Sequence, residues 1–200
     1  MKELEDILSF ISTNSLSRDM LNNDVGEVRN IHYGDIHTKF KSNFVVQEEQ
    51  VPYINKNVDL SRVNPNQYCK VGDVVIADAS EDYNDIGKTI EIIDLKDEKV
   101  LAGLHTLLGR DKIPMYVGFK GYLFQTYFVK KQIMKLSSGI SVLGLSKGNL
   151  MKVKVEIPDV REQEKIVRFI TSIDKKINLV QNQLDEMKNW KKGLLQRMFV

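Results

Sequence analysis

The sequence is poor in cysteine and has no long hydrophobic run. Cys69 is the only cysteine among the 200 residues, so no disulfide can form within the chain. Chains without disulfides are typical of reducing, intracellular compartments. No apolar stretch approaches the ~20 residues of a membrane span, and the acidic first ten residues do not follow the pattern of a signal peptide. We therefore expect a cytoplasmic protein with no membrane partner.

Motifs of the common catalytic and cofactor sites are absent as well. No glycine-rich dinucleotide or phosphate loop follows a predicted strand. Asn64-Pro65-Asn66-Gln67 departs from the Asn/Asp-Pro-Pro-aromatic motif of adenine methyltransferases. The three histidines, at positions 32, 37 and 105, do not combine with the single cysteine into the spacing of a zinc site. The sequence thus predicts no cofactor, no metal and no catalytic residue.

One enzymatic alternative stays open. Asp94-Leu95-Lys96 fits the Asp/Glu-x-Lys part of a metal-dependent nuclease core, and Asp73 or Asp78 could supply the earlier acid. Three residues at such loose spacing often occur by chance, and charges at strand edges would produce the same pattern.

Charge is unevenly distributed, although the net charge is only +2. Residues 73–98 contain nine acids and two bases, whereas residues 110–154 contain nine bases and one acid. A basic stretch beside an acidic one is compatible with a basic groove that binds nucleic acid. The solvated faces of ordinary helices and strands would give the same distribution, so charge alone leaves both interpretations open.

The hydrophobic pattern predicts an α+β domain. Short apolar or alternating runs predict strands at 71–77, 89–95, 99–108 (interrupted at Gly103) and 151–157, with a polar loop at 79–88. Strong helix formers followed by a Ser-Ser-Gly stop predict a helix over 119–136. We expect its buried face to include two leucine or methionine positions and three aromatic ones: Leu123, Phe124, Tyr127, Phe128 and Met134.

The last forty residues predict one long helix with a coiled-coil seam. Apolar residues alternate at spacings of four and three, and Lys191 is the only interruption. A helix of this length would run about 55 Å, or about 16 base pairs of DNA. The seam residues, predicted to mediate dimerisation, are Ile166, Ile170, Ile173, Ile177, Val180, Leu184, Met187, Leu194 and Met198. Such a helix cannot bury its stripe alone, so we expect a second helix from elsewhere.

Candidate DNA contacts are polar or basic residues on predicted loops, in the basic stretch, or on the outer face of the 119–136 helix. Lysines there would bind phosphates, and polar loop residues would read bases. The candidates are Lys39, Lys41, Asn43, Ser80, Lys88, Arg110, Lys112, Lys130, Lys131 and Lys147.

The chain resembles the specificity (S) subunit of type I restriction-modification systems. The most specific part is Ile157-Pro158, then Glu162-Gln163-x-x-Ile166, the heptad helix, and the closing Lys192-Gly193-Leu194-Leu195-Gln196-x-x-Phe199. Residues 28–37, 72–88 and 102–110 are also similar to one subgroup of the family's recognition domains. The resemblance implies a target recognition domain (1–157) followed by a conserved spacer helix (158–200).

The chain departs from the complete family pattern, which has two recognition domains and two spacer helices packed antiparallel. It carries one of each, so we expect a homodimer that rebuilds the two-domain arrangement and recognises two inverted half-sites on double-stranded DNA. The resemblance implies a methyltransferase (M) subunit as partner, a restriction (R) subunit as a further one, and no catalysis by this chain. A decoy fragment that only occupies the methyltransferase is the alternative.

Overall fold

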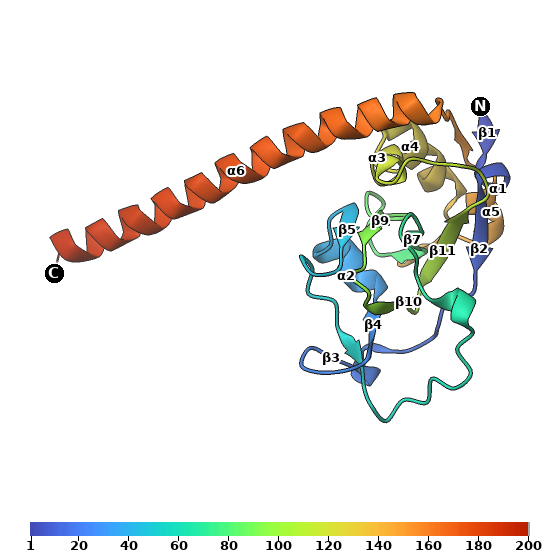
Figure 1. Cartoon of the computed structure of the whole chain (residues 1–200), viewed down its shortest axis with the longest axis horizontal. Helices are drawn as coiled ribbons and strands as arrows, with labels where there is room; N and C mark the ends of the chain where they lie inside the picture. The colour runs from blue at the N-terminus through green and yellow to red at the C-terminus, as the bar shows by residue number, and fades with distance from the viewer. Residues whose placement is uncertain (200) are drawn as a thin grey trace. The chain divides into compact units, whose positions relative to one another are not determined.

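The computed structural model describes residues 1–199, which form two compact units. The first unit spans Met1–Val160 and contains all the strands. The second begins at Arg161 and is helical. The division falls three residues after the expected end of the recognition domain. Sheets in the first unit together with a long C-terminal helix confirm the predicted α+β class (Figure 1).

A five-stranded sheet forms the centre of the first unit (Figure 1). Its order is β2-β11-β7-β9-β5. The strands are β2 (Leu8–Ile11), β5 (Asn43–Val45), β7 (Val74–Ala77), β9 (Thr89–Asp94) and β11 (Thr106–Asp111). Only the β5–β9 pair is parallel among these described strands.

Smaller elements surround this sheet. A four-stranded sheet has the order β10-β4-β6-β3, and two further pairs are β1-β13 and β12-β8. Their bounds are β1 (Lys2–Glu3), β3 (Leu21–Asn22), β4 (Val28–Ile31), β6 (Tyr53–Ile54), β8 (Ala79–Ser80), β10 (Lys99–Ala102), β12 (Leu143–Gly144) and β13 (Lys154–Val155). The helices of this unit are α1 (Leu4–Ile7), α2 (Tyr33–Thr38), α3 (Phe119–Leu123), α4 (Tyr127–Leu136) and α5 (Lys147–Met151), with 3-10 turns η1 (Arg18–Met20) and η2 (Pro65–Gln67).

Strand β7 is buried on both faces and divides the core in two. Side chains alternate between the faces of a strand. Val74 and Ile76 therefore pack in a cluster with residues of α1, α4 and α5, whereas Val75 and Ala77 pack in a second cluster with residues of α2 and β10. A continuous apolar run, rather than an alternating one, is what such a central strand requires.

The strand predictions are confirmed in part. The runs at 71–77 and 89–95 contain β7 and β9, and the run at 99–108 divides at Gly103 into β10 and the start of β11, which belong to different sheets. A Cβ at Gly103 would lie 2.8 Å from the Ile31 carbonyl oxygen, so only glycine fits at this division. The strand predicted at 151–157 is largely wrong, because Met151 ends α5 and only the two residues of β13 pair.

The helix predicted at 119–136 is two helices, and this changes its buried face. The extended backbone at Thr126 (φ −64°, ψ 142°) ends the first helical path before α4 begins. Because α4 starts anew after this break, its buried face does not continue that of α3. Val129 and Ile133 are the residues of α4 that are buried. Tyr127 and Phe128 are 76% and 50% exposed, so their predicted place in the core is wrong.

A buried ion cluster attaches α3 to the central sheet. Lys120 and Glu91 have no exposed surface, and the Lys120 Nζ lies 3.2 Å from Glu91 and 2.9 Å from Asp111. The backbone N–H of Gly121 donates to Glu91 Oε2 (2.7 Å). Burial raises the pKa of the Glu91 carboxyl above its usual value, and the Lys120 charge offsets only part of that rise. Lysine and glutamate are rarely buried unless paired, so each holds the other in place.

We predict that Lys120→Met lowers the free energy of unfolding by about 3–5 kcal/mol at pH 7, because it leaves a buried carboxylate without its counter-charge. In the variant the folded-state pKa of Glu91 lies well above its unfolded value, so the folded protein binds the proton more tightly. The loss relative to wild type should therefore shrink as the pH falls toward 4.5. Urea denaturation at both pH values measures this, with exposed Lys99→Met as control. An equal loss at both pH values would contradict it.

The second unit is a single helix, α6 (Val160–Met198), of 39 residues. At 1.5 Å per residue it is about 58 Å long. Much of its apolar stripe is solvent-exposed: Ile177, Val180, Met187 and Met198 are 60%, 61%, 65% and 71% exposed. None of the helices in residues 1–199 combines the length and the apolar character of a membrane span.

Candidate nucleic-acid interface

A cleft of about 460 Å³ opens where four separate segments of the first unit meet. It is lined by residues of α2, by residues 79–85 and by His105 and Val142. Apart from Val142, these positions fall within, or next to, the three stretches that resemble the family's recognition domains. Segments far apart in the sequence therefore contribute to one surface, and we take this cleft as the candidate interface.

All three histidines of the chain gather around Tyr33 in this region. The Tyr33 ring centroid lies 4.7 Å from that of His32, 6.0 Å from that of His37 and 5.3 Å from that of His105. The last two contacts are edge-on, a geometry that aromatic pairs prefer. Tyr33 is thus held at the cleft by rings from two elements.

Helix α2 is held at its N-terminus by a histidine cap and a buried carboxylate. His32 Nδ1 accepts a hydrogen bond from the Gly34 N–H (3.1 Å), which requires a neutral ring nitrogen. Burial, with the nearby Arg18 charge, lowers the pKa of His32. Asp35, 1% exposed, pairs with Arg18 (2.7 Å) and Lys39 (2.9 Å), and these partners hold its pKa below the usual value.

Residues 78–88 form the opposite side of the cleft and are attached to α2. His37 Nε2 donates to the carbonyl oxygen of Ala79 (2.9 Å), and Lys88 Nζ donates to the carbonyl oxygen of His37 (2.5 Å). Ser80 Oγ accepts from the Asp82 N–H (3.0 Å) and so fixes the turn that follows β8. These hydrogen bonds position the loop. The Glu81 side chain takes no part in them and is exposed at the cleft.

A second hollow, of about 420 Å³, lies between the same loop and α4. Tyr83 of the loop lines it together with Tyr127, Lys131 and Lys135 of α4. Lys131 Nζ also lies 5.6 Å from the centroid of the Tyr127 ring. Because residues 78–88 border both hollows, the cleft and the exposed basic face of α4 belong to one surface.

The cleft and its flank have opposite charge character. Glu81, Asp82 and Asp85 line the cleft, whereas Lys131 and Lys135 line the neighbouring hollow. Carboxylates repel phosphate but accept hydrogen bonds from the amino groups of cytosine and adenine. Lysines bind phosphate without reading sequence. The arrangement therefore suits base edges in the cleft and a phosphate backbone over α4.

Several predicted DNA contacts lie on or beside this surface. Ser80 lines the cleft. Lys88 lies behind it and donates a hydrogen bond to the carbonyl oxygen of His37, which lines the cleft. Lys39 directly follows α2, Lys131 lines the second hollow, and Lys130 is exposed on α4.

The remaining candidates are engaged elsewhere within the first unit. Arg110 donates to both carboxylate oxygens of Asp73 (2.8 and 2.6 Å) and to two backbone carbonyls. Lys112 donates to the Glu5 carbonyl oxygen (2.6 Å), and Lys41 pairs with Glu48 (3.5 Å). Lys147 lies over the Phe10 ring (5.9 Å), and Asn43 lies beside Gly121 of α3. Their predicted DNA contacts remain predictions, and the cleft gives them no support.

The acids of the nuclease alternative are used in ion pairs. Asp73 is 2% exposed and holds Arg110, while Asp94 pairs with Lys96 (2.8 Å). Within residues 1–199, no three His, Cys, Asp or Glu side chains are grouped so that they could hold a metal ion. The geometry gives the nuclease alternative no support.

Sequence reasoning did not identify Tyr33, His37, His105 or the acids of the cleft as a site. Spacing along the chain tests the histidines only as zinc ligands. A signal was present, because Tyr33, His37, His105 and the cleft acids all fall in the three stretches similar to recognition domains. Their convergence, however, depends on the pairing of β7 with β11, which brings His105 toward residue 78.

Comparison with known proteins identifies the family. A family model described as the type I restriction modification DNA specificity domain matches residues 1–189. The chain belongs to this family. Its description as a DNA specificity domain agrees with the expected role in DNA recognition. A curated relative, the putative type I restriction enzyme MjaX specificity subunit of Methanocaldococcus jannaschii, is 25% identical over 134 residues, which are 64% of this chain and 30% of that protein.

Solved structures of type I systems share the fold. The S subunit from M. genitalium (TM-score 0.54, 11% identity) matches over 88% of this chain and 39% of its own. The HsdS subunit from Thermoanaerobacter tengcongensis (TM-score 0.55, 15% identity) matches over 88% and 37%. A chain from a study of type I complex assembly and conformational transition (TM-score 0.62, 15% identity) matches over 96% and 42%. The chain thus spans less than half the length of each of these relatives.

We predict that His32→Asn reduces the acid sensitivity of the recognition domain. Because the folded-state pKa of His32 is lowered, the unfolded chain binds a proton more tightly, and stability falls as the pH drops below about 6.5. Asparagine keeps the capping acceptor but does not titrate in this range. The loss of unfolding free energy between pH 7 and pH 5 should be smaller in the variant, as measured by urea denaturation. His105→Asn is the control histidine, and an unchanged pH dependence in His32→Asn would contradict the assignment.

Proposed function

We propose that this chain is a DNA-recognition subunit that works as a homodimer and directs a type I methyltransferase to a bipartite, inverted site. The cleft formed by α2, residues 78–88 and His105 reads base edges, and the basic face of α4 binds the phosphate backbone. Helix α6 pairs antiparallel with α6 of a second copy and separates the two half-sites. The chain itself performs no catalysis. As a subunit that acts on cellular DNA, it would work in the cytoplasm.

The observation that carries this proposal is the exposed apolar stripe of α6. Nine seam residues lie on one heptad pattern, and Ile177, Val180 and Met187 are each at least 60% exposed. Burying a large aliphatic side chain contributes about 1.5–3 kcal/mol. Nine such residues on each helix outweigh the estimated 4–15 kcal/mol that association costs. Exposed apolar surface on this scale is typical of an interface.

The short length of the chain relative to its relatives is consistent with a two-fold symmetric dimer. The chain covers 30–42% of the relatives with which it was compared. Two copies related by a two-fold axis would supply two recognition domains and two long helices. The two half-sites would then be identical in sequence, inverted, and separated by a gap that the helix pair sets.

The assembly partners proposed are double-stranded DNA, a methyltransferase (M) subunit and a restriction (R) subunit. Support comes from the family and from the solved type I complex that the chain resembles. A decoy fragment would bind the methyltransferase but would not direct it, so modification of DNA distinguishes the two functions.

The dimerisation proposal predicts that replacing Ile173 and Leu184 together by Asp gives a monomer. Two carboxylates in the centre of an apolar seam would have to be buried without partners, which costs several kcal/mol each. Light scattering of the intact chain measures the mass. The control variant places the same two charges on the outer face of α6, at Lys175 and Asn182, and should remain dimeric. An unchanged dimer in the seam variant would overturn the proposed pairing.

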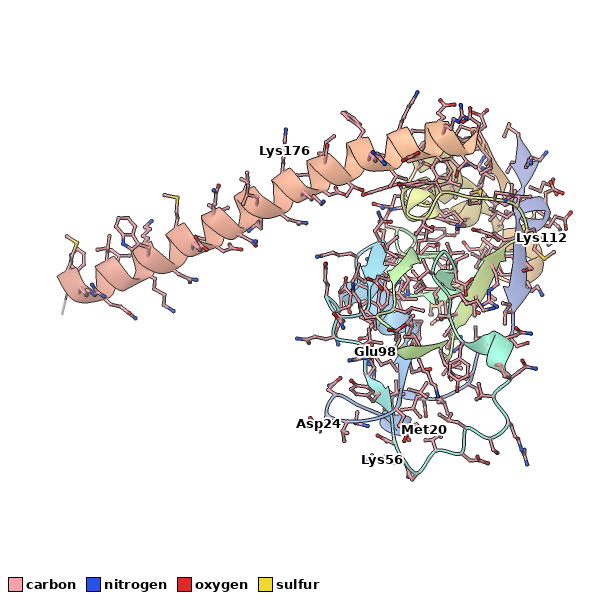
Figure 2. All side chains as sticks on the ribbon, in the orientation of Figure 1. Met20, Asp24, Lys56, Glu98, Lys112 and Lys176 are labelled. Carbon is pink, nitrogen blue, oxygen red and sulfur yellow. The ribbon has the colours of Figure 1, made fainter. Side chains whose placement is uncertain are left out.

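The DNA-binding proposal predicts that replacing Lys130 and Lys131 together by Glu weakens binding to duplexes of any sequence. Each lost phosphate contact lowers the salt dependence of the affinity by about one unit of slope. Figure 2 labels Lys56, which lies at the end of the domain remote from α4 (Figure 1). The double replacement of Lys56 and Lys99 by Glu is therefore a charge-matched control. Equal losses in the two variants would mean that α4 is not the DNA-binding face.

A further inference from the structure

The single polar residue in the seam, Lys191, has no role in a simple apolar interface. It occupies a position that the heptad pattern assigns to the interior of the helix pair, between Met187 and Leu194. A lysine at a single seam position specifies register at a cost in stability, provided that its ammonium group finds a partner. The identity of that partner depends on how two copies of α6 are aligned.

We infer that two copies of α6 pair in one register, in which Lys191 of each copy forms an ion pair with Asp174 of the other. This inference rests on the proposed antiparallel homodimer and adds the alignment of the two helices. It commits to a second copy of this chain as the occupant of the seam.

The spacing of the seam fixes the possible alignments. The spacings from Ile166 to Met198 read 4-3-4-3-4-3-4-3-4, which is the same sequence in either direction. Two antiparallel copies can therefore place every seam position opposite another. The facing pairs are Val180 with Leu184, Ile177 with Met187, Ile173 with Lys191, Ile170 with Leu194, and Ile166 with Met198. The two-fold axis then passes beside Asn182.

This alignment gives Lys191 a carboxylate. Lys191 faces Ile173 of the second copy, and the next residue, Asp174, is rotated by about 100° onto the edge of the seam. The lysine stem can cover apolar surface while its ammonium group extends to that edge. Lys188, one turn before Lys191, lies on the same side of the helix and faces the same carboxylate. Each Asp174 thus meets two cations of the other copy.

Other alignments lose this match. Sliding one helix by seven residues in one direction leaves Ile166 and Ile170 without partners. Sliding it in the other direction brings Gln163 into the seam and places Lys191 opposite Ile166, whose next residue is Val167. Only the full alignment buries all nine apolar residues and also gives Lys191 an acid.

Two exposed aromatic residues outside the seam are explained by the same alignment. Phe169 and Trp190 are 67% and 66% exposed on α6. In the inferred register Trp190 lies beside Lys176 of the second copy, and Phe169 lies beside Arg197. A cation over an aromatic ring contributes about 0.5–1 kcal/mol at an exposed site. Figure 2 labels Lys176, which projects from α6.

Charge reversal tests the inferred ion pair. Asp174→Lys and Lys191→Asp should each raise the dimer dissociation constant about tenfold, because two symmetric ion pairs become repulsive contacts. The variant with both changes should bind at least about threefold more tightly than either single variant, since the 174–191 pairs are restored with the charges exchanged, while Lys188 keeps the recovery incomplete. Glu186→Lys and Lys175→Asp, on the outer face of α6, are the matched controls and should leave the constant unchanged. Sedimentation equilibrium of the full chain measures all five.

Cross-linking tests the register independently. In the inferred alignment, position 181 of one copy lies close to position 181 of the other. Gln181→Cys should therefore be cross-linked to a covalent dimer by a short thiol-to-thiol reagent, whereas Asn182→Cys, on the outer face, should not. Cys69 is buried and does not compete.

The outcomes separate this inference from the proposed function. A dimer in which the double charge reversal is as weak as the single variants, or in which positions 181 and 182 cross-link equally, overturns the register and leaves the dimer intact. A wild-type chain that remains monomeric at high concentration overturns both. Restoration by the double variant together with selective cross-linking at position 181 supports the register.

Discussion

The apolar seam of α6 is the constraint on which the rest of the proposed assembly depends. A helix of 39 residues with one apolar stripe gains most of its stability from packing that stripe, not from intrinsic helix propensity. The recognition domain has its own core on both faces of β7 and needs no second copy to fold. The seam has no comparable core within the described part of α6, and most of its residues are exposed. The proposal therefore assigns assembly to this helix and recognition to the domain before it.

The central sheet supplies the rigidity that a recognition surface requires. Residues 78–88 leave the buried strand β7 and return to β9, so both ends of the loop are fixed by sheet pairing. Helix α2 is joined to the loop by the contacts of His37 with Ala79 and Lys88. Polar groups held in this way can read bases at low entropic cost, because few of them need to be ordered on binding.

The sequence predicted local features well and long-range ones poorly. The heptad helix could be predicted because its signal lies in spacing along the chain, as does the apolar run of β7. The buried face predicted for the 119–136 region is wrong because the break at Thr126 resets the helical phase, which exposes Tyr127 and Phe128. The cleft could not be assembled from sequence, since it depends on strand pairing that brings His105 near residue 78. Arg110 likewise looks like a free cation until its partner Asp73 is seen.

The central claim is that two identical copies form one symmetric recognition unit. The most direct test is to express the chain with the methyltransferase subunit encoded beside it and to map modified bases across the host DNA. Two symmetric copies should give a methylated motif made of two inverted, identical half-sites around a gap of fixed length. A modified motif with two different half-sites, or binding of the methyltransferase without any methylation, would contradict it.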